Sequence, residues 1–122
     1  MQTYAFWSVH EPDPSSFCLG EADAPSSPRC EAAGQRANIT RFLDAAADRR
    51  LFVILRIGPF ICGEWSYGGI PAWVNDLPGV QIRSANPSWE AAMTAFVLRL
   101  WAVVEPYTAE HGGARRSTAV RS

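Results

Sequence analysis

Residues 39–59 read ITRFLDAAADRRLFVILRIGP, and no other stretch indicates the fold class as strongly. The first half repeats apolar residues at helical spacing and contains three consecutive alanines, which favours a helix over residues 39–50. The second half, LFVIL at 51–55, is a continuous apolar run, typical of a parallel strand that is buried on both faces. A helix that leads directly into such a strand predicts an α/β fold.

A second strand and a second helix flank this segment. Residues 2–7 are rich in aromatic side chains and are predicted to form a strand, followed by a proline-rich turn at 10–14. Residues 87–107 are predicted to form a helix, with Asn86 as its N-cap and Pro87 in its first position. Its expected apolar face consists of Trp89, Met93, Phe96, Val97, Leu100, Trp101 and Val104.

The remaining segments are predicted to be loops. Residues 15–36 are polar and are expected to form a long surface loop without regular structure. Residues 60–79 are rich in Gly, Pro and Trp and follow the carboxyl end of a strand, where α/β folds bind ligands. Residues 111–122 show no periodicity and indicate a frayed tail. Asn38 is expected to cap the helix that follows it, an interpretation we prefer to N-glycosylation of the sequon that begins there.

The composition argues against several classes of protein. The chain has 122 residues with 11 basic and 12 acidic side chains, a formal net charge of -1, which argues against a nucleic-acid binder with a basic patch. No apolar run approaches the roughly 18–20 residues of a membrane span, and the first residues lack a secretory signal. No phosphate-binding loop, dinucleotide fingerprint or nucleophile elbow occurs, so no cofactor is expected.

The sequence leaves the bonding state of the three cysteines open. Cys18 and Cys30 form either a disulfide or two free loop thiols, and Cys62 lies beside an apolar run. No metal site is expected, because there is no CxxC motif and because His10 and His111 are far apart in sequence.

Aromatic and charged side chains gather where the predicted strands end. Tyr4 lies in the first predicted strand and Glu11 comes after it. Arg56 ends the second predicted strand, and Glu64 lies in the Gly/Trp loop beyond that strand. Aromatic faces can stack on a pyranose and carboxylates accept hydrogen bonds from its hydroxyls, which points to sugar recognition. Structural roles compete with this interpretation: Glu11 could cap a backbone group or pair with Arg56, and His10 could be a hydrogen-bonded structural residue.

Several long motifs then occur in a recognisable order. TYAFWSVHEP at residues 3–12 resembles the TYxxWxxHEP motif of glycoside hydrolase family 35, the β-galactosidases. LRIGPFICGEW at residues 55–65 resembles the family's LRxGPYxCAEW, and YGGIPAW at residues 67–73 resembles its FGGLPAW. Within this resemblance residues 1–113 are part of the catalytic barrel, residues 15–36 include a loop insertion and residues 114–122 are a divergent tail.

The resemblance implies a (β/α)8 barrel of which the chain holds about the second and third βα units. It also implies a retaining hydrolase that removes terminal β-D-galactose with two glutamates, one of which lies in an Asn-Glu pair. No Asn-Glu pair occurs in these 122 residues, and no catalytic residue is carried over. A barrel of this type needs ~250 residues, so we expect a fragment whose two predicted strands both have exposed edges and which is inactive in isolation.

Carried over position by position, the resemblance implies four substrate-binding residues. Tyr4 matches a tyrosine that contacts the substrate, and Glu64 matches a glutamate that binds galactose hydroxyls without transferring a proton. Cys62 and Gly63 match positions whose backbone lines the sugar pocket, with Gly63 in place of the usual alanine.

The expected ligand is therefore a β-galactoside, with neither nucleic acid nor membrane as a partner. Three interpretations follow. The chain is part of a β-galactosidase whose remaining barrel is encoded elsewhere, a non-catalytic or vestigial galactoside-binding module, or a fragment that assembles with another chain. Family members are often secreted, vacuolar, lysosomal or cell-wall proteins, so the resemblance leaves the compartment open.

Overall fold

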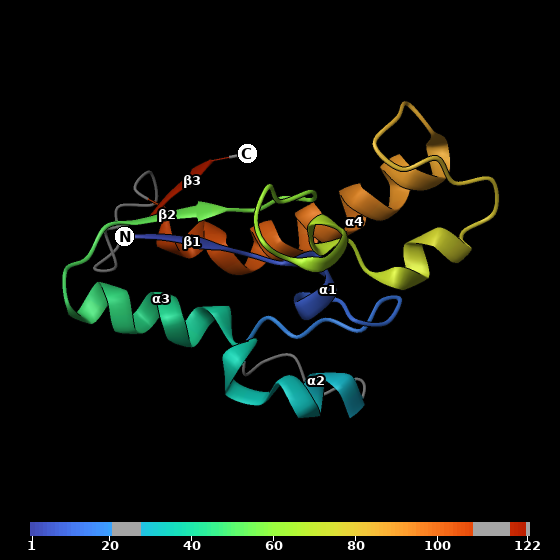
Figure 1. Ribbon diagram of the computed structural model, residues 1–122. Helices are drawn as coiled ribbons and strands as arrows, with labels where there is room; N and C mark the ends of the chain where they lie inside the picture. Colours follow the sequence, from blue (N-terminus) through green and yellow to red (C-terminus); the bar gives the residue numbers. More distant parts are fainter. Residues whose placement is uncertain (21–27, 109–117, 122) are drawn as a thin grey trace.

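A parallel sheet of three strands forms the centre of the computed structural model, which describes residues 1–20, 28–108 and 118–121 (Figure 1). The strands β1 (Gln2–Tyr4), β2 (Val53–Arg56) and β3 (Thr118–Arg121) lie in the order β1-β2-β3. Helix α3 (Ile39–Asp48) connects β1 to β2 along the chain, and α4 (Pro87–Val104) precedes β3. The alternation of parallel strands and helices agrees with the predicted α/β class.

The helix boundaries follow their capping residues. The side chain of Asn38 accepts a hydrogen bond from the backbone N–H of Arg41 at 2.8 Å, and Asn86 accepts one from that of Trp89 at 3.1 Å. Both predicted N-caps are thereby confirmed. The helix predicted over 87–107 divides in two, because α4 ends at Val104 and a 3-10 turn, η4 (Glu105–Tyr107), follows with Pro106 inside it.

The strand predicted near the N-terminus is too long, and the turn predicted after it is confirmed in part, because the N–H of Ser16 donates to the carbonyl of Asp13 at 3.0 Å. The strand predicted over 2–7 ends at Tyr4, and α1 (Trp7–His10) occupies residues that include the start of the predicted turn. The Trp7 side chain is fully buried, so the chain turns away from the sheet to place it in the core.

The predicted loop over 15–36 contains α2 (Pro28–Ala33) and η1 (Gly34–Arg36), while residues 21–27 lie outside the described residues. A disulfide joins Cys18 to Cys30, with 5.5 Å between their Cα atoms, which settles the pairing in favour of a bond. Both sulfurs lie in a small buried cluster with Ala37, so this segment is anchored on the body of the molecule.

The predicted tail is also corrected. Residues 118–121 form β3, which pairs in parallel with β2 so that Val53 faces Thr118 and Arg56 faces Arg121. The described part of the chain therefore contains three strands where two were predicted, and β2 has a neighbour on each side, so the exposed edge expected for it is paired. The part of the predicted tail at 111–117 and at residue 122 lies outside the described residues.

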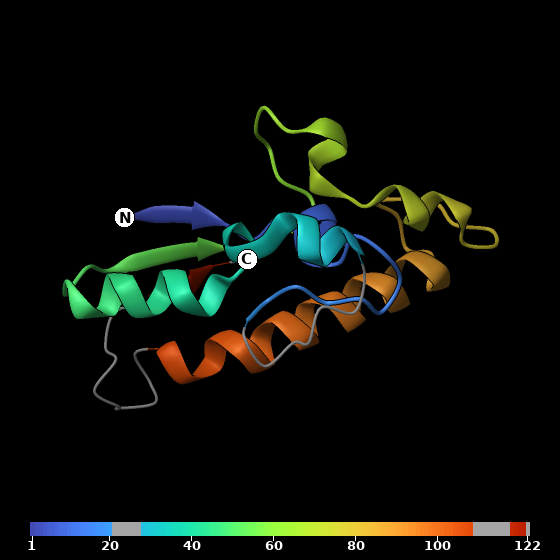
Figure 2. The same cartoon turned by 90° about the horizontal axis from the view of Figure 1, so that it is seen from below.

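The two faces of the sheet differ in burial. Val53 and Leu55 are almost fully buried, whereas Ile54 is 38% exposed and Arg56 is exposed. The prediction that this strand is buried on both faces is wrong, because the described helices cover only one of them. Figure 2 shows α4 running along that covered face. The 3-10 turns η2 (Ser66–Gly69) and η3 (Ala72–Asp76) lie beyond the carboxyl ends of β1 and β2.

Trp7 is the centre of the core. Its ring stacks on Phe96 of α4 at 5.2 Å between centroids, and it also meets Trp89 at 5.7 Å and Trp73 at 5.9 Å. The predicted apolar face of α4 is confirmed for Trp89, Phe96, Leu100 and Val104, which are buried, but Trp101 is 39% exposed.

No helix within the described ranges is long and apolar enough to cross a membrane.

Candidate functional site

Tyr4 is held at the carboxyl end of β1 by its neighbour on β2. The guanidinium of Arg56 donates a hydrogen bond to the Tyr4 hydroxyl at 3.0 Å, and its central carbon lies 5.3 Å from the centre of the Tyr4 ring. This contact follows from the register, which places Tyr4 opposite Arg56 on the uncovered face of the sheet. Arg56 thus pairs with Tyr4, and the alternative in which it pairs with Glu11 is wrong.

An aromatic row, defined here as Tyr4, Phe6 and Trp65, connects β1 to the loop after β2. The Phe6 ring stacks on Tyr4 at 5.7 Å and on Trp65 at 4.4 Å between centroids. Trp65 is 45% exposed and its indole N–H donates to the hydroxyl of Ser8 at 3.3 Å. The row therefore places Tyr4 and the residue that follows Glu64 on one continuous surface.

The loop that presents Glu64 is closed by its own backbone. The N–H of Ile61 donates to the carbonyl of Gly68 at 2.8 Å, and the N–H of Gly68 donates to the carbonyl of Trp65 at 3.3 Å. Tyr67 and Gly68 have φ values of 56° and 63°, in the left-handed region that favours glycine. At Gly68 a side chain would force the Phe60 ring to shift, because a Cβ would lie 2.2 Å from that ring.

Cys62, Gly63 and Glu64, three of the four predicted site residues, are exposed at this loop. A turn forms here, in which the N–H of Trp65 donates to the carbonyl of Gly63 at 2.8 Å. Within the described ranges, the Glu64 carboxylate makes no hydrogen bond or ion pair, so its oxygens are available to accept hydrogen bonds from a ligand. The structure thus brings Tyr4 and Glu64 to the same end of the sheet through the aromatic row.

His10 and Glu11 are buried and serve the fold. The His10 Nδ1–H donates to the carbonyl of Cys18 at 3.1 Å, and burial lowers the pKa of the ring despite its backbone contacts. The Glu11 carboxylate accepts from the indole N–H of Trp7 at 2.7 Å and from the backbone N–H of Ser15 at 3.0 Å. Burial raises the pKa of Glu11, and these two hydrogen bonds oppose that rise. The structural interpretation of His10 and Glu11 is supported by these contacts.

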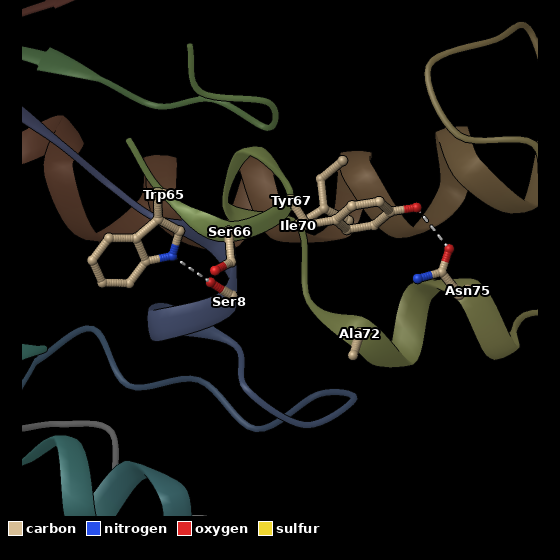
Figure 3. Close-up of a pocket in the computed structure, with 7 residues that line it drawn as sticks. All are labelled: Ser8, Trp65, Ser66, Tyr67, Ile70, Ala72 and Asn75. Atoms are coloured by element: carbon tan, nitrogen blue, oxygen red, sulfur yellow. Dashed lines mark hydrogen bonds between the residues drawn. The ribbon is translucent and has the colours of Figure 1, made fainter. Parts of the chain in front are cut away.

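A pocket adjoins the aromatic row (Figure 3). It has a volume of about 380 Å³ and lies between Trp65 and Tyr67, with the side chains of Ser8, Ser66 and Asn75 along its walls. The Tyr67 hydroxyl donates to the Asn75 side-chain oxygen at 2.9 Å. Sequence reasoning missed Asn75, because the left-handed backbone at Tyr67 that brings the two together has no signature in the residue pattern.

The arrangement is suited to binding a neutral, hydroxyl-rich molecule. It combines exposed aromatic faces, an accessible carboxylate and several hydroxyl and amide groups around one end of the sheet. Among the described residues, no group of three or more His, Cys, Asp or Glu side chains is placed to hold a metal ion.

Comparisons with known proteins identify similar chains. The model of the glycosyl hydrolases family 35 matches residues 1–114. Probable beta-galactosidase 2 of Dictyostelium discoideum is 34% identical over 113 residues, which are 93% of this chain and 13% of that protein. Beta-galactosidase 6 of Oryza sativa subsp. japonica is 38% identical over 96 residues, 79% of this chain and 10% of that protein. Beta-galactosidase 10 of Arabidopsis thaliana is 34% identical over 96 residues, 79% of this chain and 11% of that protein. The chain thus spans about a tenth of the length of these curated relatives.

Proposed function

The chain belongs to glycosyl hydrolases family 35, and from this premise we propose that it forms the part of a β-galactosidase barrel that holds the terminal β-D-galactosyl unit of a substrate. The family implies a TIM-barrel catalytic domain, and we assign β1 with α3 and β2 with α4 to about its second and third βα units. In such barrels the substrate lies at the carboxyl ends of the strands, where Tyr4 and the loop of Glu64 meet.

One observation carries the proposal: the aromatic row joins Tyr4 on β1 to the loop after β2. The Tyr4 hydroxyl is fixed by Arg56, and the Glu64 carboxylate is exposed and accessible. A carboxylate accepts hydrogen bonds from vicinal sugar hydroxyls, and the exposed backbone of Cys62 and Gly63 is proposed to line the same sugar position. Each group binds the sugar, and none is assigned the proton transfer or nucleophilic attack that glycoside hydrolysis needs.

The uncovered face of the sheet fits the same assignment. Ile54 and Arg56 are exposed on the face that also carries Tyr4, and this face would line the interior of a closed barrel. The chain is proposed to supply a substrate-holding wall of the site, while the two catalytic glutamates belong to other strands of such a barrel. The isolated chain should then give no turnover of a chromogenic β-galactoside, and hydrolysis that Glu64→Gln abolishes would overturn the binding role assigned to Glu64.

Calorimetry with methyl β-D-galactoside tests the binding role directly. An open half-site is poorly preorganised, so we expect a dissociation constant on the order of millimolar. Glu64→Gln keeps the shape of the side chain and removes its charge, and it should weaken binding about tenfold through the loss of charge-assisted hydrogen bonds. Glu90→Gln is the matched control, because Glu90 is also an exposed acid and lies in the first turn of α4. Equal affinities for the two variants would contradict the role of Glu64.

A further inference from the structure

The segment that leads into α3 contains a sequon that the proposed function does not use. Asn38, Ile39 and Thr40 follow the pattern Asn-x-Ser/Thr without proline, which is the acceptor sequence for N-linked glycans. Asn38 is partly exposed at the point where the chain enters the helix. No residue of the proposed galactose site belongs to this segment, so a role for the sequon stands or falls separately from the proposed function.

The Asn38 side chain uses only its oxygen within the fold. Its Oδ1 accepts hydrogen bonds from the backbone N–H of Arg41 and from the hydroxyl of Thr40, both at 2.8 Å. Because a backbone N–H can only donate, the atom that faces it is the oxygen, and the amide nitrogen Nδ2 lies on the other side of the carboxamide. Among the described residues Nδ2 has no hydrogen-bond partner, and no buried side-chain nitrogen or oxygen there lacks one. Nδ2 is therefore open to solvent.

Asn86, the N-cap of α4, shows a different arrangement. Its Nδ2 donates a hydrogen bond to the carbonyl of Gly79 at 2.9 Å, while its Oδ1 caps the helix. Ser88 follows two positions later, but the intervening Pro87 breaks the sequon. Of the two N-caps, only Asn38 combines an acceptor sequence with an amide nitrogen that the fold leaves unused.

The surface beside Asn38 has room for a sugar ring. A depression of about 320 Å³ is lined by Asn38, Arg36, Arg41, Phe42 and Ala45. Asn38, Phe42 and Ala45 share one side of α3, because helix residues three or four positions apart are neighbours. The Phe42 side chain is partly exposed, and an aromatic ring can pack against the apolar face of a sugar. A first N-acetylglucosamine on Asn38 thus has open space beside the helix.

The disulfide places this segment in the compartment where glycosylation also occurs. Cys18 and Cys30 are bonded, and they form a buried cluster with Ala37, the residue before Asn38. Disulfides form and persist in oxidising compartments such as the lumen of the endoplasmic reticulum, where N-glycans are transferred to nascent chains. The disulfide and the sequon therefore point to the same compartment.

We propose that Asn38 is an N-glycosylation site and that its glycan coexists with its role as the N-cap of α3. In the transfer, Nδ2 forms a bond to C1 of the first N-acetylglucosamine, and the bond from that C1 to the pyrophosphate of a lipid-linked oligosaccharide breaks. The amide loses one proton to a base of the oligosaccharyltransferase, and the lipid pyrophosphate leaves. Oδ1 is not altered, so it continues to accept from Arg41 and Thr40.

The test follows the 122-residue chain, fused to a cleavable signal peptide, through translation in the presence of endoplasmic-reticulum microsomes. Chains that have lost the signal peptide have entered the lumen, and only these chains are scored. Most of them should carry a glycan that peptide N-glycosidase F removes, and mass spectrometry should then find aspartate at position 38. Signal-cleaved chains without a glycan at Asn38 would overturn the proposal.

Three variants separate the sequon from the cap. Asn38→Asp keeps a good N-cap residue and removes the acceptor nitrogen, whereas Thr40→Ala removes the hydroxyl of the sequon and leaves Asn38 in place. Both variants should lose the glycan completely. Thr40→Ser keeps a hydroxyl at this position and should stay modified. A glycan that persists in Asn38→Asp or in Thr40→Ala would be attached elsewhere and would contradict the assignment.

Coexistence of the glycan with the cap is measured as stability. Radiolabelled chains made with and without a competing acceptor tripeptide differ only in the glycan, and pulse proteolysis in urea gives the midpoint of each. The two midpoints should agree, because the glycan leaves both hydrogen bonds of Asn38 Oδ1 intact. A clear fall in the midpoint on glycosylation would overturn the claim that Asn38 serves both roles.

Discussion

Replacing Gly68 by alanine should destabilise the chain more than the same change at a left-handed glycine that has no close neighbours. Two effects add. A residue with a Cβ at φ 63° costs about 1–2 kcal/mol. The new Cβ would also lie 2.2 and 2.3 Å from two ring carbons of Phe60, far inside the roughly 3.5–4.0 Å of a normal carbon contact. Such overpacking costs about 1–3 kcal/mol, so the total is about 2–5 kcal/mol.

Moving the Phe60 ring aside would disturb its contact with the guanidinium of Arg83, which lies 4.2 Å from the ring centre. Gly79→Ala isolates the backbone contribution, since Gly79 has φ 66° and a Cβ at this position would meet no atom within 4 Å. The difference between the two variants, about 1–3 kcal/mol, is the contact with Phe60.

Urea denaturation followed by tryptophan fluorescence measures both variants. At a slope of about 1–3 kcal/mol/M, Gly68→Ala should lower the midpoint by about 1 M or more. In a double-mutant cycle, Phe60→Ala should recover much of the loss at Gly68. The reasoning is refuted if Gly68→Ala costs no more than Gly79→Ala, or if the loss persists unchanged in the Phe60→Ala background.

Replacing both Cys18 and Cys30 by serine should lower the free energy of unfolding by about 3 kcal/mol, because the disulfide links positions 12 residues apart. Urea midpoints that match the unmodified chain would contradict this. Because burial lowers the pKa of His10 below 6.5 in the folded chain, its stabilising contribution is present above pH 6.5 and is lost as the pH falls through the folded pKa. His10→Gln should therefore flatten the fall in urea midpoint between about pH 7 and pH 5, and an unchanged pH profile would rule this contribution out. Gly63→Ala should be neutral or stabilise by about 0.4–1 kcal/mol, since its Cβ would meet only Ile61 at 3.7 Å; a clear loss in urea midpoint would show that the loop needs glycine here.

The helices α3 and α4 could be predicted from the sequence because local chemistry determines them. Each has an asparagine cap and a run of apolar residues at helical spacing, and both signals act within a few residues. The four-residue strand β3 could not be predicted, because it depends on pairing with β2, which lies far away along the chain. The helix α2 could not be predicted because a disulfide from Cys30 to Cys18 holds it on the body of the molecule, and the sequence left that disulfide undecided.

In the candidate site, too, local motifs could be predicted from the sequence, whereas contacts between distant segments could not. The motifs indicated Tyr4 and Glu64 by position, but residue types alone allowed Arg56 to pair with Glu11. The register of β1 and β2 determines the partner of Arg56, because it places Arg56 opposite Tyr4. The Glu11 carboxylate instead accepts a hydrogen bond from the buried indole of Trp7. The pocket wall at Tyr67 depends on left-handed backbone that no spacing rule encodes for a tyrosine.

The most direct test of the account is to map where methyl β-D-galactoside contacts the 122-residue chain. Backbone amide signals in a ¹⁵N NMR titration report this residue by residue. We predict that the largest shifts fall on residues 62–65 and around Tyr4, and that Glu64→Gln removes them. Shifts that are absent at saturating sugar, or that fall elsewhere and are the same in Glu64→Gln, would contradict the claim that Tyr4 and Glu64 form a galactose-holding site.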